Sequence, residues 1–337
     1  MPKTEQIFIV GSSRSGTTMM GRILGNHPAI FTFKELHFFG TIWTNNSGTS
    51  LDKKQQIDLL SRLLCIAEYG LFQQSNISDF NEKGSVLLID KNIPNPLGIY
   101  ELFLSAITLD NKCTIACEQT PKNMYYLNEI LAYFPNTKVI NMVRDQRDVL
   151  LSQKNKWKRR FLGASAIPLS EAIRSYINYH PILTAKVWNS SLEHSSKFIN
   201  TTRVKIIKFE ELLADANSVV KEICQFLDID FQEKMLRVPV VGSSTEKDTK
   251  SELVIDSSKI EKWKNGGLSS AEIYLSQLMS KIMMQEFKYE LKKFRFPPLL
   301  TIFYLITFPI KLALAFLLNI KRMGNIVEVV KKRFFVK

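Results

Sequence analysis

Ile7-Phe-Ile-Val-Gly-Ser-Ser-Arg-Ser-Gly-Thr-Thr18 is the stretch that decides the fold of this 337-residue chain. The apolar run Ile7–Val10 predicts a buried strand, and the apolar residues that follow Thr17 at helical spacing predict a helix. Gly11 and Gly16 bracket the polar loop between the two elements. A strand, a glycine-rich loop and a helix start direct several backbone N–H groups toward one anion. The stretch therefore predicts a phosphate-binding loop.

The loop departs from the motif of nucleotide triphosphatases at one position. That motif, G-x-x-x-x-G-K-[ST], has a lysine directly after its second glycine, whereas this chain has Thr17 there. A positive charge is still present within the loop, at Arg14. We therefore expect a ligand with a phosphate-like end that is not an ordinary magnesium-bound triphosphate.

The net charge of +13 is concentrated near the C-terminus. Residues 281–337 contain 12 Lys and Arg against 3 Asp and Glu, a net charge of +9, which leaves +4 for the first 280 residues. This distribution favours an anionic membrane surface near the C-terminus over a nucleic-acid groove across the body. The sequence also lacks zinc-finger and RNA-recognition signatures, so we expect no nucleic-acid partner.

Strand patterns alternate with helix patterns along the chain, which predicts an α/β fold with a mainly parallel, doubly wound sheet flanked by helices. Ligands of such sheets bind at the carboxyl ends of the strands. Polar or charged groups stand at four such ends, in Gly11–Thr18, Glu35, Glu118–Lys122 and Arg144. The other strands are expected at Ala29–Phe33, Val86–Asp90, Thr114–Ala116, Lys138–Val143 and Arg203–Phe209.

Helices are expected between these strands and through much of the second half of the chain. Residues 40–58, which are polar and rich in Ser, Asn and Thr, predict a long loop or lid. Pro94 and Pro96 are expected to break the chain. The predicted helices are Leu59–Tyr69, Asn123–Tyr133, Arg147–Arg160, Ser170–Lys197, Ala216–Leu227 and Ser269–Phe287.

Several segments, taken in order, resemble those of sulfotransferases that use 3′-phosphoadenosine 5′-phosphosulfate (PAPS). The resemblance covers about residues 5–290 and is closest to carbohydrate and tyrosyl-protein sulfotransferases. It implies a three-layer, P-loop-like fold for a sulfotransferase domain at residues 1–295, followed by a hydrophobic and basic segment at 296–337. The segments are Ile9–Thr18, Glu118–Pro121, Val139–Ser152, Phe209–Leu227 and Lys262–Lys264.

PAPS carries a phosphosulfate at one end and a 3′-phosphate at the other, so it needs two anion sites. The resemblance implies that the glycine loop holds the first and that Arg144 and Ser152 hold the second, which suits the bidentate hydrogen bonding of arginine. A salt bridge from Arg144 to Asp145 or Asp148 is the structural alternative. The predicted cofactor-binding residues are Arg14, Ser15, Gly16, Thr17, Thr18, Arg144, Ser152, Lys262 and Trp263.

The acceptor hydroxyl needs a base. Glu35 is the first choice, because Lys34–Phe39 resembles the strand end that supplies a catalytic Glu in carbohydrate and tyrosyl-protein sulfotransferases. Glu35 can accept the proton if burial raises its pKa toward neutrality. His37 is the rival, since the cytosolic branch of the family uses a histidine, although a histidine beside two phenylalanines can equally be a packed side chain.

Gln119 completes the predicted catalytic set of Glu35, Arg14, His37 and Gln119. It stands where relatives often have a lysine that contacts the transferring group. A glutamine can donate a hydrogen bond but supplies no charge, so Arg14 or Lys122 is expected to compensate. The implied in-line displacement needs no metal, because positioned cations and N–H groups can stabilise the charge on the leaving oxygen.

The resemblance implies an acceptor hydroxyl on a glycan, a glycolipid or another lipid. Its pocket is expected from residues 40–110 and 155–200, which contain no motif that names the acceptor. Lys154–Arg160 is strongly basic and either lines an entrance for an anionic glycan or lipid headgroup or forms a solvated face. The oligomeric state has no signal in the sequence.

Leu299–Leu318 is a stretch of 20 residues with a single charge, Lys311, which is long enough to span a membrane. Basic flanks at both ends favour the cytoplasmic side, and a break at Pro309 would allow a re-entrant or surface-lying segment. We expect cytoplasmic localisation with peripheral or C-terminally anchored attachment to the membrane; a helix packed on the domain or at a dimer interface is the alternative. The flanking residues are Lys292, Lys293, Arg295, Lys321, Arg322 and Lys331–Arg333.

Two other functions are consistent with the sequence. A P-loop kinase-like phosphotransferase would use Val86–Asp90 as a magnesium-carboxylate strand, although the loop lysine is missing. A non-catalytic nucleotide-binding or membrane-scaffolding protein would be compatible with Gln119.

Overall fold

A parallel five-stranded sheet forms the centre of the computed structural model, which describes residues 4–45, 50–71, 74–165, 167–239, 252–255, 259–320 and 325–334. β1 (Glu5–Gly11) is the middle strand of the order β2-β3-β1-β4-β5. All four pairings in this sheet are parallel, which confirms the predicted doubly wound sheet. The other strands are β2 (Ile30–Thr32), β3 (Ile115–Glu118), β4 (Lys138–Val143) and β5 (Val204–Lys208).

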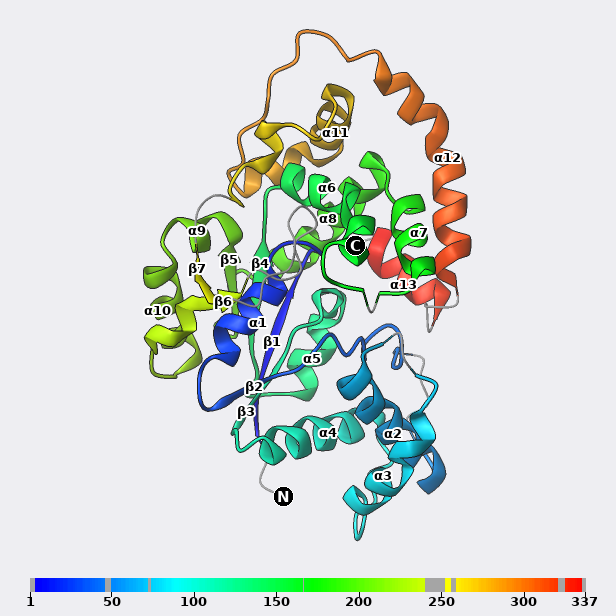
Figure 1. The fold of residues 1–337 in the computed structure, drawn as a ribbon, viewed down its shortest axis with the longest axis vertical. Helices are drawn as coiled ribbons and strands as arrows, with labels where there is room; N and C mark the ends of the chain where they lie inside the picture. Colours follow the sequence, from blue (N-terminus) through cyan, green and yellow to red (C-terminus); the bar gives the residue numbers. More distant parts are fainter. Residues whose placement is uncertain are drawn as a thin grey trace.

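Alternate residues of β1 enter two separate cores, one on each face of the sheet. Phe8 and Val10 belong to one cluster, whereas Ile7 and Ile9 belong to the other, and all four are buried. The expected three-layer architecture is confirmed, with helices on both faces (Figure 1). One face carries α2 (Lys53–Tyr69), α4 (Pro96–Asp110) and α5 (Leu127–Tyr133), and the other carries α1 (Thr17–Gly25), α9 (Phe209–Ala214) and α10 (Ala216–Leu227).

A third cluster of buried apolar residues lies beyond the end of β4. Val143 at the end of β4 packs with Val149, Trp188 and Met284 from three helices. These helices position the segment that follows β4, which carries Arg144. They are α6 (Gln146–Lys154), α8 (Pro181–Ser196) and α11 (Ser270–Glu286), and a two-stranded antiparallel sheet of β6 (Arg237–Pro239) and β7 (Glu252–Val254) lies near α1.

The strand predicted at Val86–Asp90 is wrong. This run completes helix α3 (Asn81–Leu87) and the turn after it. Leu88 is fully buried, but Val86 is 58% exposed and Ile89 is 60% exposed. A short apolar run has the same composition in a buried strand and at the end of a helix, so its length and periodicity could not distinguish them.

Two prolines each begin a helix: Pro96, where a chain break was expected, and Pro181, inside a helix predicted as continuous. Pro96 is the first residue of α4, and the side chain of Asn95 caps that helix by accepting a hydrogen bond from the N–H of Leu97 at 2.9 Å. Pro181 likewise begins α8, so the single helix predicted over Ser170–Lys197 is two helices, α7 (Leu169–Ile177) and α8. Proline suits the first helical position because its missing N–H would have no partner there.

Two other predicted boundaries also change. α2 begins at Lys53, inside the predicted loop or lid, because Asp52 and Gln55 form a capping box there. Residues 46–49 of that loop lie outside the described residues. The helix expected to reach Arg160 ends at Lys154 and gives way to a 3-10 helix, Lys156–Phe161.

The C-terminal segment returns to the domain as two helices. α12 (Leu300–Asn319) contacts α7, α8 and α11, and α13 (Ile326–Phe334) contacts α8. α12 continues through Pro309, so the helix is not broken at that proline. It forms the right-hand edge of the molecule in Figure 1. Lys321 and Arg322, two of the predicted flanking cations, lie outside the described residues.

α12 is long and apolar enough to cross a membrane by length and composition, the one such helix among the described residues. Its mean hydropathy is 2.0 over the best window, of which 11% is buried. Ile302, Ile306 and Ile310 form an outward row and are 61%, 68% and 63% exposed. The helix is therefore packed on the domain along one side and presents a large apolar face on the other.

Candidate active site

The glycine loop joins β1 to α1 at the carboxyl end of the sheet. Gly11 has a φ of +142°, and a Cβ there would lie 2.2 Å from the carbonyl oxygen of Met142 in β4. Gly16 has a φ of +94°, and a Cβ there would lie 2.4 Å from the ring of Phe209. Both positions require glycine because of close approach as well as backbone conformation. The predicted strand, loop and helix start are therefore confirmed.

The first turn of α1 is open to an anion. α1 begins at Thr17, and in the part of the chain that the structure describes no side chain caps its N-terminus. Gly16, Thr17 and Thr18 line a cavity there, whereas Ser15 is fully buried and its N–H is hydrogen-bonded to the carbonyl oxygen of Ser12 at 3.2 Å. Unpaired N–H groups at a helix start are a suitable site for a phosphate or sulfate.

Arg14 and Ser152 connect this loop to the segment after β4. The Nε atom of Arg14 donates to Oγ of Ser152 at 2.8 Å, and both residues line the cavity. Burial and the charges of Arg159 and Arg144 lower the pKa of Arg14 to about 9, so the guanidinium is positive at neutral pH. The two predicted anion subsites thus meet at one hydrogen bond.

Arg144 lies beside Arg14 and faces the same cavity. Its two terminal nitrogens donate to the backbone carbonyl oxygens of Arg14 at 3.4 Å and Lys259 at 3.3 Å, and its guanidinium stacks 4.4 Å from the ring of Phe209. The carboxylate of Asp148 is 3.8 Å away. The Nε atom of Arg144 is buried and has no hydrogen-bond partner among the described residues. An anionic oxygen in the cavity would satisfy this guanidinium better than these long contacts do.

Lys262 and Trp263, the last predicted cofactor-binding residues, differ in position. Lys262 lines the cavity. Trp263 is 7% exposed, and its ring stacks 3.9 Å from the guanidinium of Arg147 and does not line the cavity. Its backbone N–H donates to Asp148 at 2.9 Å, so Trp263 fixes the carboxylate that faces Arg144.

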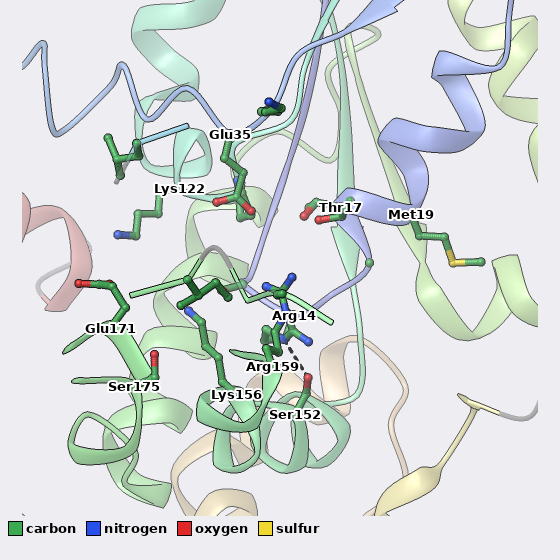
Figure 2. Close-up of a pocket in the computed structure, with 18 of the residues that line it drawn as sticks. Arg14, Thr17, Met19, Glu35, Lys122, Ser152, Lys156, Arg159, Glu171 and Ser175 are labelled. Atoms are coloured by element: carbon green, nitrogen blue, oxygen red, sulfur yellow. Dashed lines mark hydrogen bonds between the residues drawn. The ribbon is translucent and has the colours of Figure 1, made fainter. Parts of the chain in front are cut away.

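Glu35 and His37 lie on the other side of the cavity, after β2. The Nε2 atom of His37 is 3.1 Å from an oxygen of Glu35, and both side chains line the cavity. Figure 2 shows the carboxylate of Glu35 pointing into the same space as Thr17 and Arg14. The donor loop and the predicted base therefore face one another.

The pKa of Glu35 moves in the direction opposite to the expected one. Burial raises it, but the hydrogen bond and charge of His37, together with Lys156 and Lys122, outweigh burial and lower the pKa below its ordinary value. The expectation of a pKa raised toward neutrality is therefore wrong. Glu35 is ionised, and so able to accept a proton, throughout the neutral range.

A buried carboxylate holds the Glu35–His37 segment in place. Glu118, at the end of β3, accepts hydrogen bonds from the N–H of Leu36 at 3.4 Å and of Thr120 at 3.1 Å, and also from the side chains of Thr120 and Asn123. The hydroxyl of Thr120 in turn accepts from the N–H of His37 at 3.2 Å. Burial raises the pKa of Glu118 to about 7. These contacts make Glu118 a support for the predicted base, Glu35, and for His37.

Gln119 does not line the cavity. Its side-chain oxygen lies against α1, where a Cβ on Gly21 would come within 2.8 Å of it. Lys122, three residues on, does line the cavity. The structure therefore gives Lys122, and not Gln119, access to a bound ligand.

The cavity as a whole is strongly cationic. It has a volume of about 940 Å³, and the described residues that line it include twelve Lys and Arg but only three Asp and Glu, namely Glu35, Asp148 and Glu171. Residues of both expected ranges, 40–110 and 155–200, contribute to its lining. The basic residues are Arg14, Arg22, Lys34, Arg62, Lys122, Arg144, Lys156, Arg159, Arg174, Lys259, Lys262 and Arg333.

Comparison with known protein families agrees with this geometry. The profile of the sulfotransferase family matches residues 6–233, which is more than half of the chain and contains the glycine loop, Glu35, Arg144 and Ser152. The chain belongs to the sulfotransferase family. The resemblance inferred from the motifs is thereby confirmed.

Individual relatives are distant. The chain is 24% identical over 294 residues to an uncharacterized protein of Aquifex aeolicus (strain VF5), covering 85% of the present chain and 33% of that protein. The chain thus spans about a third of the length of this curated relative.

Two solved structures share the fold. The sulfotransferase domain from the curacin biosynthetic pathway matches with a TM-score of 0.52 and 20% identity, over 87% of this chain and 99% of that one. The sulfotransferase domain of the Synechococcus PCC 7002 olefin synthase matches with a TM-score of 0.51 and 20% identity, over 87% and 98%. At this identity the likeness supports the fold alone.

Sequence reasoning missed the part of the cavity that the C-terminal helices build. Asn319 at the end of α12 and Arg333 in α13 both line it. Arg174 in α7, which also escaped prediction, hydrogen-bonds to Asn319 at 2.6 Å. The only available signal was the basic run that includes Arg333, and this run was interpreted as a membrane flank.

Proposed function

We propose that this sulfotransferase transfers the sulfuryl group of PAPS to a hydroxyl of a carbohydrate or lipid acceptor. The observation that carries the proposal is the hydrogen bond between Arg14 and Ser152, which joins two anion subsites in one cavity. A ligand with separated 5′ and 3′ anionic groups fits this arrangement. PAPS supplies the reactive sulfuryl group when it is bound.

The residues at the donor end fit such a ligand. The N–H groups and hydroxyls of Thr17 and Thr18 would hold the phosphosulfate at the start of α1. Arg144 and Ser152 would hold the 3′-phosphate, for which the buried, unsatisfied Nε of Arg144 is an independent indication. Lys262 lies on the cavity wall and would add positive charge there.

Glu35 would act as the general base. Its lowered pKa keeps it ionised, and His37 orients it through the 3.1 Å contact. As the acceptor oxygen bonds to sulfur, Glu35 would take the hydroxyl proton and the bond from sulfur to the bridging oxygen would break. Arg14 would balance the charge that develops on that oxygen, because it is the cation of the loop itself and Gln119 is outside the cavity.

We also propose that the protein attaches peripherally to the cytoplasmic face of a membrane through residues 296–337. The support is the outward apolar face of α12 together with the exposed cation Lys331 of α13. A helix that is packed along one side suits a surface-lying position better than a crossing of the bilayer.

The donor assignment is tested by titrating the full chain with 3′-phosphoadenosine 5′-phosphate (PAP), AMP and Mg·ATP in a calorimeter. PAP and AMP differ by the 3′-phosphate alone. We expect PAP to bind at least a hundredfold more tightly than AMP, and Mg·ATP to bind weakly. Equal affinities for PAP and AMP, or a preference for Mg·ATP, would refute the proposal; the latter would indicate the kinase alternative, for which the strand at Val86–Asp90 is already absent.

A further inference from the structure

Three cations of the cavity act on one another and have no direct ion pair among the described residues. Lys122, Lys156 and Arg333 line the cavity, and within the described ranges none of them forms an ion pair. Arg174, in contrast, is paired with Glu171 at 2.6 Å. Glu35 is the carboxylate that acts on Lys122 and Lys156, so several positive side chains share one negative charge and can accept an added anion.

Lys122 lies beside Glu35 and on the side away from α1. Figure 2 shows Lys122 on the far side of Glu35 from Thr17, with Lys156 pointing into the same space from below. The Arg333 charge is the largest influence that lowers the pKa of Lys122, followed by burial and the charge of Lys156. Burial, together with Arg14, lowers the pKa of Lys156 to about 8. The charges therefore act on one another across a shared space.

Arg333 reaches this space because α13 is fixed on the domain. The neighbouring Lys332 forms an ion pair with Glu129 and donates to the carbonyl oxygen of Tyr125 at 3.0 Å. The hydroxyl of Ser190 donates to the carbonyl oxygen of Lys332 at 3.3 Å. The packing of α13 is thus specific, and it directs Arg333 and Lys332 to different partners.

We propose that Lys122, Lys156 and Arg333 form a further anion subsite, separate from the two proposed for PAPS, which binds a phosphate-like group of the acceptor. The acceptor is then an alcohol that already carries an anionic group, and the C-terminal helix α13 is part of its binding site. The inference rests on the proposed function, because it assigns the donor anions to Arg14, Arg144 and Ser152. A phosphorylated lipid headgroup and a soluble phosphorylated sugar share this chemistry.

The test measures a second anion on a protein already saturated with PAP. Inorganic phosphate is titrated into the PAP-loaded full chain by calorimetry. We expect one phosphate to bind per chain, and Arg333→Gln and Lys122→Gln each to weaken it at least tenfold while changing PAP affinity less than threefold. Lys331→Gln is the matched control, since Lys331 is an exposed cation on the same helix that does not line the cavity. Arg333→Lys should restore most of the affinity.

The outcomes separate the two proposals. Failure of PAP itself to bind would refute the proposed donor. PAP binding with no second phosphate, or loss of phosphate binding that is equal in Lys331→Gln and Arg333→Gln, would refute the anion subsite alone. Loss of PAP binding in Arg333→Gln would place α13 at the donor site and would also overturn the inference.

A second arm identifies the source of the anion. The PAP-loaded chain with inorganic phosphate bound is mixed, in separate samples, with phosphatidylcholine vesicles that contain phosphatidic acid and with glucose 6-phosphate. Release of inorganic phosphate from the subsite by the vesicles, lost in Arg333→Gln, supports a lipid headgroup. Release by glucose 6-phosphate alone supports a soluble acceptor. Release by neither would contradict a phosphate-bearing acceptor.

Discussion

The Nε atom of Arg14 donates a 2.8 Å hydrogen bond to Oγ of Ser152, although 138 residues separate them in the chain. Arg14 belongs to the loop after β1, and Ser152 belongs to the helix after β4. Because β1 and β4 are adjacent and parallel, their carboxyl ends bring both residues to one edge of the sheet. A contact between two proposed anion subsites implies that ligand affinity at one depends on the other.

Ser152→Ala should reduce PAP affinity about tenfold and leave AMP affinity within twofold. The proposed partner of Ser152 is the 3′-phosphate, and a hydrogen bond to a charged group contributes about 1.5–3 kcal/mol. Calorimetric titration of both nucleotides measures the effect. Ser175→Ala is the control, because Ser175 lines the cavity from α7 and has no proposed phosphate contact, so it should change neither affinity. An equal loss of PAP and AMP binding in Ser152→Ala would contradict the assignment.

The acidic limb of the pH profile of kcat/KM should lie below the ordinary pKa of a glutamate. The base is active when deprotonated, and the pKa of Glu35 is lowered by His37 in opposition to burial. His37→Gln removes the imidazole and its charge, so the pKa of Glu35 rises and the limb moves to higher pH. A limb that stays in place in His37→Gln, with activity lost at all pH values, would show that His37 is the base instead.

Binding of inorganic phosphate to the PAP-loaded chain at pH 8 should be accompanied by proton uptake. The pKa of Lys156 is about 8, so about half of these side chains are neutral at that pH, and a nearby anion raises the pKa. Calorimetry in buffers with different ionisation enthalpies measures the uptake, which we expect to be up to about half a proton per phosphate bound. Lys156→Arg should abolish most of it, while Lys158→Arg, an exposed neighbour, should not. Identical uptake in both variants would contradict this origin.

Gly16→Ala should destabilise the protein more than Gly266→Ala does. Both glycines have a positive φ, which costs a substituted residue about 1–3 kcal/mol. A Cβ at Gly16 would also meet the ring of Phe209 at 2.4 Å, whereas nothing lies within 4 Å of one at Gly266. Overpacking adds about 1–3 kcal/mol. Thermal unfolding measures the difference, and PAP titration should show that only Gly16→Ala loses the nucleotide; equal effects would refute the role of this contact.

The apolar face of α12 should bind vesicles. Replacing Ile302, Ile306 and Ile310 together by serine removes an outward row without touching the side that packs on the domain. We expect the full chain to sediment with vesicles of phosphatidylcholine and phosphatidylglycerol, and the triple variant to lose at least tenfold in partitioning. Unchanged thermal unfolding would show that the variant is folded. Equal partitioning of the two proteins would contradict membrane attachment through α12.

The central sheet and the glycine loop were predictable because their signals are local. The buried strand β1, the glycines at fixed spacing and the start of α1 occupy one continuous stretch, and Arg144 and Ser152 follow β4 in the same way. In these elements local propensity, hydrophobic pattern and turn chemistry all indicate the same structure, so their sequence pattern is strong.

Other features depended on contacts that no local pattern contains. Val86–Asp90 has the composition of a strand, but the sheet is complete without it. The pKa of Glu35 depends on His37, Lys156 and Lys122, which the fold brings together from three segments. The return of Arg333 to the cavity depends on the docking of α13, which reaches the domain only after a long apolar helix.

The central claim is sulfuryl transfer from PAPS with Glu35 as the base. The most direct measurement incubates [35S]PAPS with fractionated lipids and glycans and compares the full chain with Glu35→Gln. We predict that the unaltered protein transfers label to a hydroxyl-bearing acceptor, and that Glu35→Gln transfers at least a thousandfold less while it still binds PAP. Label transfer that persists in Glu35→Gln would contradict the assignment of the base. Absence of transfer by the unaltered protein to every fraction, with no PAP binding, would contradict the account as a whole.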